Sequence, residues 1–201
     1  MIRVILAEDQ AMVRGALASL LGLELDIEVV GEAADGEAAV AVAVQKLPDI
    51  ALLDIEMPVM DGLSASAKIT SQVPGCRVMI LTTFGRPGYL RTAMEAGAVA
   101  FLVKDSPARE LAAAIRRVHA GERVIDPGLA AAALSAGPNP LSARERDVLA
   151  AAVDGSTIGD IARHLHLSEG TVRNYLSSAI QKTHARNRIE AVQRAKSQGW
   201  L

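Results

Sequence analysis

The chain has 201 residues, a net charge of −2 and 50% apolar residues, so it is long enough for one large domain or two modest ones. No apolar run reaches the roughly 20 residues that a membrane span needs, and no basic-then-apolar leader opens the chain. The single cysteine, Cys76, excludes an internal disulfide and any multi-cysteine metal site. These features lead us to expect a cytosolic protein without direct membrane contact.

The charge is distributed unevenly along the chain. Residues 1–121 carry a net charge of −4, whereas residues 141–201 carry +3. An acidic first part and a basic last part predict two domains, with a polyanion as a candidate partner of the second.

Apolar runs and helical spacing alternate through the first 121 residues. Short apolar runs predict strands at 2–7, 27–30, 49–53, 77–81 and 99–103. Helical spacing, turn residues and caps predict helices at 11–22, 35–44, 63–73, 87–96 and 107–120, the last capped by Ser106. This alternation predicts an α/β flavodoxin-like fold, a five-stranded parallel sheet in the order 2-1-3-4-5 with helices on both faces.

Chemically active side chains follow four of these strands. Glu8 and Asp9 follow the first strand, Asp54 the third, Thr82 the fourth and Lys104 the fifth. The carboxyl ends of parallel strands meet at one edge of a sheet, where ligands bind. Taken alone, Asp54 could equally solvate a turn or cap a helix. The clustered carboxylates instead predict a Mg²⁺ site, and a carboxylate nucleophile beside Lys104 and Thr82 suits phosphoryl transfer.

These residues resemble the receiver domain of two-component response regulators. The motifs are Glu8-Asp9, Asp54 with Met57-Pro58 and Asp61-Gly62, Thr82, and Phe101 three residues before Lys104. The resemblance implies that Asp54 accepts a phosphoryl group from a sensor histidine kinase. It implies a Mg²⁺ ion bound by Glu8, Asp9, Asp54 and the backbone carbonyl of Glu56. Thr82 and Lys104 would contact the phosphoryl group, and Phe101 would be the aromatic that moves inward, although a plain core aromatic is the alternative.

Two positions depart from the receiver pattern. Asp105 follows Lys104 where many receivers have proline, so a cis peptide bond is not assured there. Phe84 occupies a position that helps to set the phosphoryl lifetime, so the lifetime cannot be inferred.

Residues 122–140 differ in composition from both neighbours. Asp126-Pro127 suits a helix start, the residues to Ala136 are nearly all Ala and Leu, and Gly137-Pro138-Asn139-Pro140 breaks the pattern. We expect a partly helical linker, whose helix could also pack as part of either domain.

Residues 141–201 have the pattern of four short helices. Ser142 to Glu145 is a capping box, and Ser168 caps a helix with one apolar and one polar face. Two short helices joined by a tight turn predict a helix-turn-helix, although an ordinary amphipathic helix is the alternative. Arg and Asn can read bases, which favours Arg173 and Asn174, whereas Thr171, Lys182 and Arg188 suit phosphates.

This part resembles the four-helix DNA-binding domain of the LuxR/NarL group. The matching residues are Leu141-Ser142, Arg144-Glu145, Gly155, Ile161-Ala162, Leu167-Ser168, Thr171-Val172-Arg173, Lys182, Asn187-Arg188 and Glu190-Ala191. The resemblance implies base contacts from Arg173, Asn174 and Ser177, and dimerisation through 187–198. Ile158 and Thr183-His184 depart from the pattern, the latter at the end of the recognition helix.

The whole chain is therefore identified as a member of the NarL/FixJ group of response regulators. Phosphorylation of Asp54 would promote a homodimer that binds double-stranded promoter DNA, with RNA polymerase as a further candidate partner. Met12, Val13, Ile115 and Val118 on the first and fifth helices are candidates for the dimer contact. Membrane-lipid genes, such as a desaturase gene, are candidate targets.

Two alternatives stay open at this stage. One is a DNA-binding dimer that does not use phosphate. The other is an aspartyl-phosphate phosphatase of the haloacid dehalogenase type, which would want a second Asp where this chain has Glu56.

Overall fold

The computed structural model describes residues 1–83, 87–104, 108–135 and 139–201. The chain forms two compact units, the first made mostly of residues up to 131 and the second mostly of residues from 132 onward. Expectations about Phe84, Asp105, the Ser106 cap and the Gly137-Pro138 break lie outside the described residues. In the described part, no helix is both long enough and apolar enough to cross a membrane.

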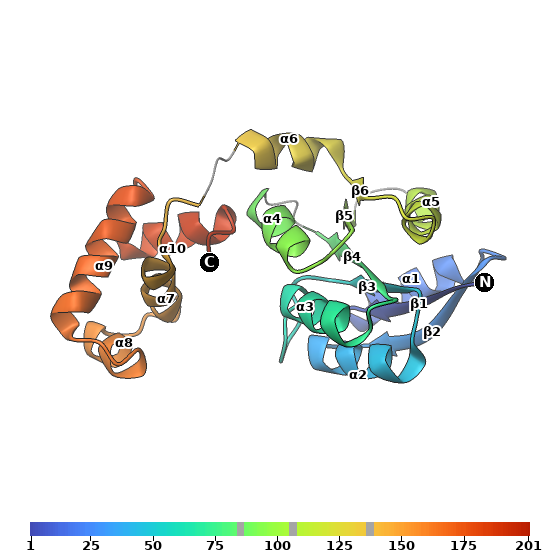
Figure 1. The fold of residues 1–201 in the computed structure, drawn as a ribbon, viewed down its shortest axis with the longest axis horizontal. Helices are drawn as coiled ribbons and strands as arrows, with labels where there is room; N and C mark the ends of the chain where they lie inside the picture. The colour runs from blue at the N-terminus through green and yellow to red at the C-terminus, as the bar shows by residue number, and fades with distance from the viewer. Residues whose placement is uncertain (84–86, 105–107, 136–138) are drawn as a thin grey trace. The chain divides into compact units, whose positions relative to one another are not determined.

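Strands and helices alternate through the first unit, as predicted (Figure 1). The strands are β1 (Ile2–Ala7), β2 (Ile27–Ala33), β3 (Ile50–Leu53), β4 (Arg77–Thr82), β5 (Ala100–Val103) and β6 (Val124–Ile125). The helices are α1 (Ala11–Leu21), α2 (Gly36–Lys46), α3 (Gly62–Gln72), α4 (Pro87–Glu95) and α5 (Ala108–His119).

The described strands form one parallel sheet in the order β2-β1-β3-β4-β5-β6. The predicted order 2-1-3-4-5 is confirmed, and the sheet has one strand more than predicted. This strand, β6, lies in the segment expected to be a linker and pairs Val124 with Ala100 and Ile125 with Phe101. Two residues are too few to show strand periodicity in a sequence.

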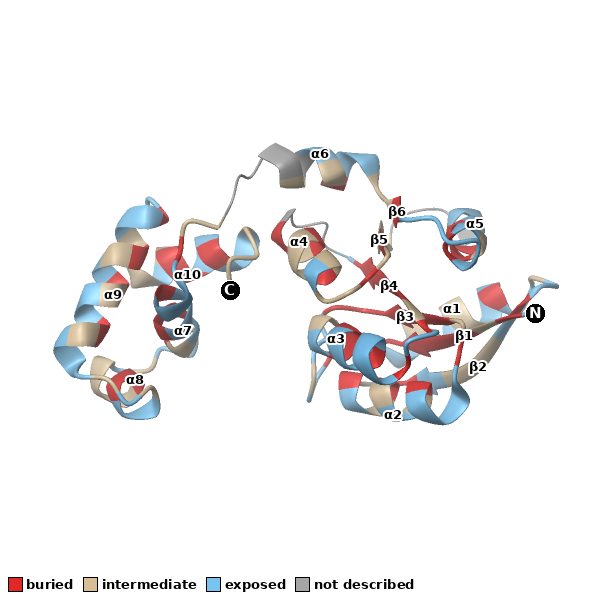
Figure 2. Ribbon diagram, viewed as in Figure 1, coloured by how far each residue is buried: buried red, intermediate tan, exposed pale blue. Residues whose placement is uncertain are grey.

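The central strands β1, β3 and β4 are almost entirely buried because helices cover both faces of the sheet (Figure 2). Alternate strand residues such as Val4, Leu52 and Met79 pack with α1 and α5 in one cluster. The residues between them point to the other face, against which α2 and α3 pack. Ile115 and Val118 of α5 belong to the first cluster and are fully buried. The expectation that these two offer dimer contact area is therefore wrong, whereas Met12 of α1 is 87% exposed.

The helix α6 (Pro127–Ser135) follows β6, and the second unit contains α7 (Ala143–Ala151), α8 (Ile158–His164), α9 (Glu169–Lys182) and α10 (Arg188–Ser197). The predicted four-helix pattern of residues 141–201 is confirmed. The Ser142 to Glu145 capping box is formed, and the Ser168 side chain accepts a hydrogen bond from the Thr171 amide at the start of α9. The four helices enclose a separate apolar core around Val148, Leu149 and Val172.

Candidate functional site

Three carboxylates meet at the carboxyl edge of the sheet, as their positions after β1 and β3 predict. One carboxylate oxygen each from Glu8, Asp9 and Asp54 lie within 4.8 Å of one another. Glu8 is 1% and Asp54 6% exposed, whereas Asp9 faces solvent. The cluster is therefore half-enclosed, with one open side from which a ligand could enter.

The backbone brings the three acids together. β1 and β3 are neighbours in register, with Ala7 opposite Leu53. The Asp54 amide continues this pairing by donating a 2.9 Å hydrogen bond to the Ala7 carbonyl. Glu8 is held from the other side, since its amide donates a 3.1 Å bond to the Ala33 carbonyl at the end of β2. The site is thus an extension of the sheet, and its backbone is held by hydrogen bonds to both neighbouring strands.

Lys104, which follows β5, supplies the cation of the site. Its Nζ lies 2.5 Å from Glu8 Oε2 and 3.1 Å from Asp54 Oδ2. All three side chains are largely buried, so these contacts are screened less by water and salt than surface pairs are. Lys104 reaches across the β3 and β4 ends to Glu8, which explains why residues distant in sequence act as one group.

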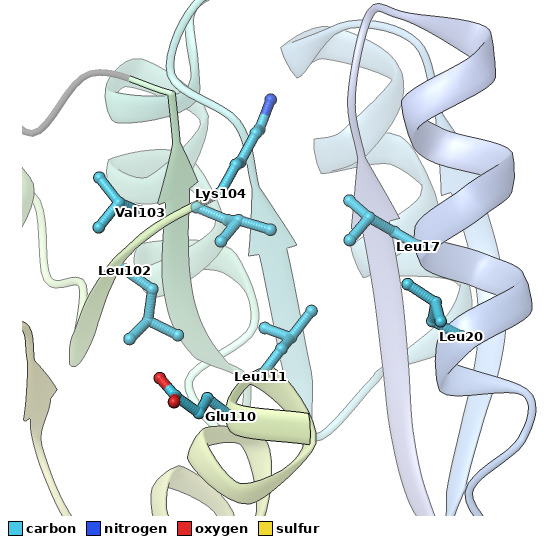
Figure 3. A pocket seen from close by; sticks show the side chains of 8 residues that line it. Leu17, Leu20, Leu102, Val103, Lys104, Glu110 and Leu111 are labelled. Carbon is cyan, nitrogen blue, oxygen red and sulfur yellow. The ribbon is translucent and has the colours of Figure 1, made fainter. Parts of the chain in front are cut away.

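An apolar cavity of about 220 Å³ lies beside this lysine, between α1 and α5. Figure 3 shows Leu17 and Leu20 of α1 facing Leu111 of α5 across it, with Lys104 at one end. Lys104 is one of the residues that line the cavity, and its ammonium reaches the acids. A long aliphatic stem with a polar tip suits such a boundary between apolar and charged surroundings.

Burial has an electrostatic consequence for Asp54. Desolvation raises the pKa of its carboxyl group above the ordinary value, and the Lys104 ammonium offsets only part of that rise. The nearby Glu8 carboxylate raises this pKa further. A divalent cation in the cluster would favour the ionised form of Asp54, because it stabilises negative charge nearby.

Two glycines allow the loop after Asp54 to fold tightly. A Cβ on Gly62 would lie 1.8 Å from the Asp54 carbonyl oxygen, and one on Gly36 would lie 2.3 Å from the Met60 carbonyl oxygen. The Gly36 amide donates a 3.0 Å hydrogen bond to that same Met60 carbonyl, which ties the loop to the start of α2. The sequence marked Asp61-Gly62 as a turn, but nothing in it indicated that Gly36 contacts this loop.

Thr82 and Phe101 lie at the positions expected for them on β4 and β5. Thr82 is buried at the end of its strand, and its carbonyl accepts a 2.8 Å hydrogen bond from the Lys104 amide. Phe101 is fully buried and pairs in register with Ile80 and Ile125. Their roles in a conformational switch stay predictions.

The donor set fits a magnesium ion. Three carboxylates and one ammonium leave two negative charges, which a divalent cation would neutralise. Carboxylate oxygens are the ligands that Mg²⁺ prefers, and an open side leaves room for its waters. The Glu56 side chain is exposed, and the role predicted for its backbone carbonyl stays a prediction.

The second unit presents a polar surface along α9. Arg173, Asn174 and Ser177 are exposed, while Val172 and Leu176 of the same helix lie in the core. The Arg173 guanidinium lies 2.8 Å from the Glu169 carboxylate one turn earlier. This ion pair is exposed and therefore weak, so a ligand could replace Glu169 as the partner of Arg173. The three residues predicted to face bases therefore share one solvent-facing side of this helix.

The three residues predicted to face phosphates have partners within the second unit. The Thr171 hydroxyl lies 2.8 Å from Ser168 Oγ at the start of α9. Arg188 donates a 2.9 Å hydrogen bond to the Ser156 carbonyl, and Lys182 Nζ lies 2.8 Å from Glu145 Oε2. Nothing in the sequence indicated that Arg188 and Lys182 contact other residues of the second unit.

Comparison with known proteins finds a matching family in each of the two units. Residues 4–116 match the response regulator receiver domain, and residues 139–195 match the bacterial regulatory proteins of the luxR family. The transcriptional regulatory protein DesR and the uncharacterized transcriptional regulatory protein YvfU, both of Bacillus subtilis, are each 46% identical over 201 residues, which is the full length of both chains.

Solved structures show the same architecture. The response regulator ChrA of a heme-sensing two-component system is 33% identical, with a TM-score of 0.59 over 100% of this chain and 98% of that one. A structure of two RcsB dimers bound to two parallel DNAs has a TM-score of 0.68 over 98% of each chain, and at 23% identity it supports the fold alone. The chain belongs to the NarL/FixJ-type response regulators, close to DesR, and joins a receiver domain to a LuxR-type DNA-binding domain.

Proposed function

We propose that this response regulator is switched by phosphorylation of Asp54 and controls transcription in the cytoplasm, where promoter DNA lies. The observation that carries the proposal is the enclosure of Asp54 by Glu8, Asp9 and Lys104 at the carboxyl edge of the sheet. Such an arrangement is costly for stability unless a bound group exploits it, because like charges converge in a poorly solvated place.

The proposed reaction moves a phosphoryl group from a histidine of a sensor kinase to Asp54. The phosphorus–nitrogen bond of the donor breaks, a bond forms between phosphorus and an Asp54 carboxylate oxygen, and the departing imidazole takes up a proton. Lys104 would then pair with a phosphoryl oxygen, since its ammonium already lies 3.1 Å from Asp54. Thr82 would donate its hydroxyl proton to another phosphoryl oxygen.

Glu8, Asp9 and Asp54 would hold a Mg²⁺ ion, with the Glu56 carbonyl as a proposed fourth protein ligand. When bound, the ion supplies charge stabilisation to the phosphoryl oxygens. The residues of this chain orient the nucleophile. Asp54 is held by the hydrogen bond that its amide donates to the Ala7 carbonyl, and Gly62 allows the following loop to pass close to the Asp54 carbonyl.

Phosphorylation adds a charge of about −2 to the site and would bias a two-state receiver. Movement of Thr82 and Lys104 toward the phosphoryl group is the proposed first step. Phe101 is already fully buried, so we propose that it repacks within the core. A homodimer through exposed parts of the receiver, with Met12 as a candidate, and through α10 would follow. Two copies of α9 would then meet DNA half-sites about one helical turn apart.

On the DNA, Arg173, Asn174 and Ser177 are the proposed base contacts because they are exposed on one side of α9. Thr171 and Arg188 remain proposed phosphate contacts. The similarity to DesR supports a regulatory role in transcription, and RNA polymerase and membrane-lipid genes are proposed as partner and target.

Treatment with acetyl phosphate tests the switch. We expect a magnesium-dependent mass increase of about 80 Da on Asp54, absent from Asp54→Asn, and tighter retention of genomic fragments in gel retardation by the treated wild type. A protein that binds DNA equally well with and without the adduct would be a phosphate-independent dimer. Continuous release of phosphate from a simple ester by Asp54 would indicate a phosphatase instead.

A further inference from the structure

The second unit contains a buried carboxylate that links two of its helices. Glu145, near the start of α7, is 5% exposed. Its oxygens accept hydrogen bonds of 2.6 Å from the Ser142 amide, 2.6 Å from the Ser178 hydroxyl and 2.8 Å from Lys182 Nζ. Among the described residues, no buried side-chain nitrogen or oxygen lacks a hydrogen-bond partner. The group is therefore fully satisfied within the protein.

Two of these donors lie on α9, the helix proposed to read bases. Ser178 and Lys182 are four residues apart, so they occupy successive turns on the same side of the helix. Arg173, Asn174 and Ser177 occupy its exposed side. The Glu145 carboxylate thus fixes both the rotation and the axial position of α9 relative to α7, and with them the direction of the exposed side chains.

Because Glu145 is charged, its contact with Lys182 is costly to break. Burial raises the pKa of the carboxyl group, but hydrogen bonds from Lys182, Ser178 and Ser142 overcome that effect and lower the pKa to about 2. The group is ionised at neutral pH. If Lys182 left it for a DNA phosphate, a buried carboxylate would lose its cation, which is strongly unfavourable. A solvent-exposed phosphate contact would recover only part of that loss.

We infer that Lys182 and Glu145 are positioning residues that set the orientation of α9, and that Lys182 neutralises Glu145 and not a DNA phosphate. This inference rests on the proposed binding of DNA by α9. It replaces the expectation that Lys182 belongs with Thr171 and Arg188 among the phosphate contacts.

The salt dependence of DNA binding separates the two roles. Each phosphate that a protein cation neutralises contributes about 0.9 to the slope of log K against log salt concentration. The full-length chain would be titrated by fluorescence anisotropy with a duplex that the wild type has selected from a random-sequence pool, at several KCl concentrations. The variants are Lys182→Met, Glu145→Gln, the double variant and, as the phosphate-contact control, Arg188→Met. Each is checked for native unfolding behaviour by Trp200 fluorescence.

We expect Lys182→Met to weaken binding by about tenfold, as for the loss of a hydrogen bond to a charged group, with the wild-type slope. Glu145→Gln should also weaken binding. The double variant should bind the duplex at least as tightly as the single variant of lower affinity, because the two residues act as one unit. Arg188→Met, which removes a proposed phosphate contact, should lower the magnitude of the slope by about 0.9. If Lys182→Met fails to fold, the slope can still be measured with the double variant, because the double variant leaves no unpaired buried charge.

A fall of about 0.9 in the slope for Lys182→Met or for the double variant would overturn the inference. So would tighter binding by Glu145→Gln, which would mean that Glu145 restrains a lysine able to bind phosphate. If the wild-type chain selects no duplex at all, the proposed DNA-binding function fails, which is a distinct result.

Discussion

Lys104 Nζ lies 3.1 Å from Asp54 Oδ2, and both side chains are largely buried at the same sheet edge. The ammonium therefore has two possible tasks. Before phosphorylation it reduces the repulsion among the acids, and afterwards it would pair with the phosphoryl group.

The first prediction separates these tasks with Lys104→Met. Removing the cation leaves three carboxylates without a counter-charge, so we expect Mg²⁺ to bind about tenfold more tightly in isothermal titration calorimetry. At saturating Mg²⁺, phosphorylation by acetyl phosphate should nevertheless be slower, because the phosphoryl oxygens lose their partner. The exposed Lys68 provides a matched control, and Lys68→Met should change neither quantity. Weaker Mg²⁺ binding by Lys104→Met would contradict the charge argument.

The second prediction concerns the loop that follows Asp54. In Gly62→Ala the new methyl group would lie 1.8 Å from the Asp54 carbonyl oxygen, so backbone must shift. We expect the receiver to lose about 1–3 kcal/mol in its free energy of unfolding, measured by urea and far-UV circular dichroism. Phosphorylation should slow as well, because the shifted atoms include Asp54 itself.

Gly15→Ala is the matched control for that substitution. Its methyl group would meet nothing within 4 Å, and Gly15 lies inside α1. Alanine is the better helix former, so we expect a gain of about 0.5–1 kcal/mol. Equal effects of the two substitutions would show that backbone entropy, and not crowding at Asp54, determines the result at Gly62.

The third prediction is a pH dependence of the second unit. The pKa of Glu145 is lowered from 4.5 to about 2 in the folded protein. A carboxyl group whose pKa is lower when folded stabilises the fold above its unfolded pKa and loses that contribution as pH falls toward the folded value. We therefore expect wild type to be more stable than Glu145→Gln by about 1–3 kcal/mol at pH 7, with the difference shrinking between pH 4.5 and about 2.

Trp200 makes this measurement specific, because it is the single tryptophan and packs against the core of the second unit. Its fluorescence during urea unfolding reports on that unit alone. The exposed Glu169 serves as control, and Glu169→Gln should leave the stability nearly unchanged at every pH. A difference between wild type and Glu145→Gln that stays constant down to pH 2 would refute the assignment.

The fourth prediction concerns Cys76. Its thiol is buried, and desolvation raises its pKa to about 12, so the reactive thiolate is scarce at pH 8. We expect a disulfide reagent such as Ellman's reagent to modify it at least about 100-fold more slowly in the native protein than in guanidinium chloride. A cysteine placed at the exposed Ser71 should react rapidly under the same native conditions.

The acidic edge of the receiver sheet could be predicted because it depends on the order of the strands along the chain. Once the strands alternate with helices, the residues after β1, β3 and β5 must meet, so Glu8, Asp54 and Lys104 were predictable as a group. The contact of Gly36 with Met60 was not, because it joins two loops whose paths depend on backbone geometry that residue types do not encode locally.

Helix faces were predictable, but the partners of long side chains were not. Periodicity places Arg173, Asn174 and Ser177 on the polar side of α9, as observed. It cannot show that Lys182 reaches back to Glu145, since a lysine can extend toward solvent or toward a neighbouring helix. Ile115 and Val118 failed as surface candidates for a related reason, because the apolar side of α5 faces the sheet.

The short strand β6 also bears on how the receiver could be studied alone. Its pairing covers the backbone of β5 at Ala100 and Phe101, and the Asp126 amide adds a 3.3 Å bond to the Phe101 carbonyl. A fragment ending at Gly121 would leave β5 as an open sheet margin, where another molecule could add a strand and begin aggregation. A fragment ending at Ala131 would retain the protecting strand, and its yield and solubility should exceed those of the shorter piece.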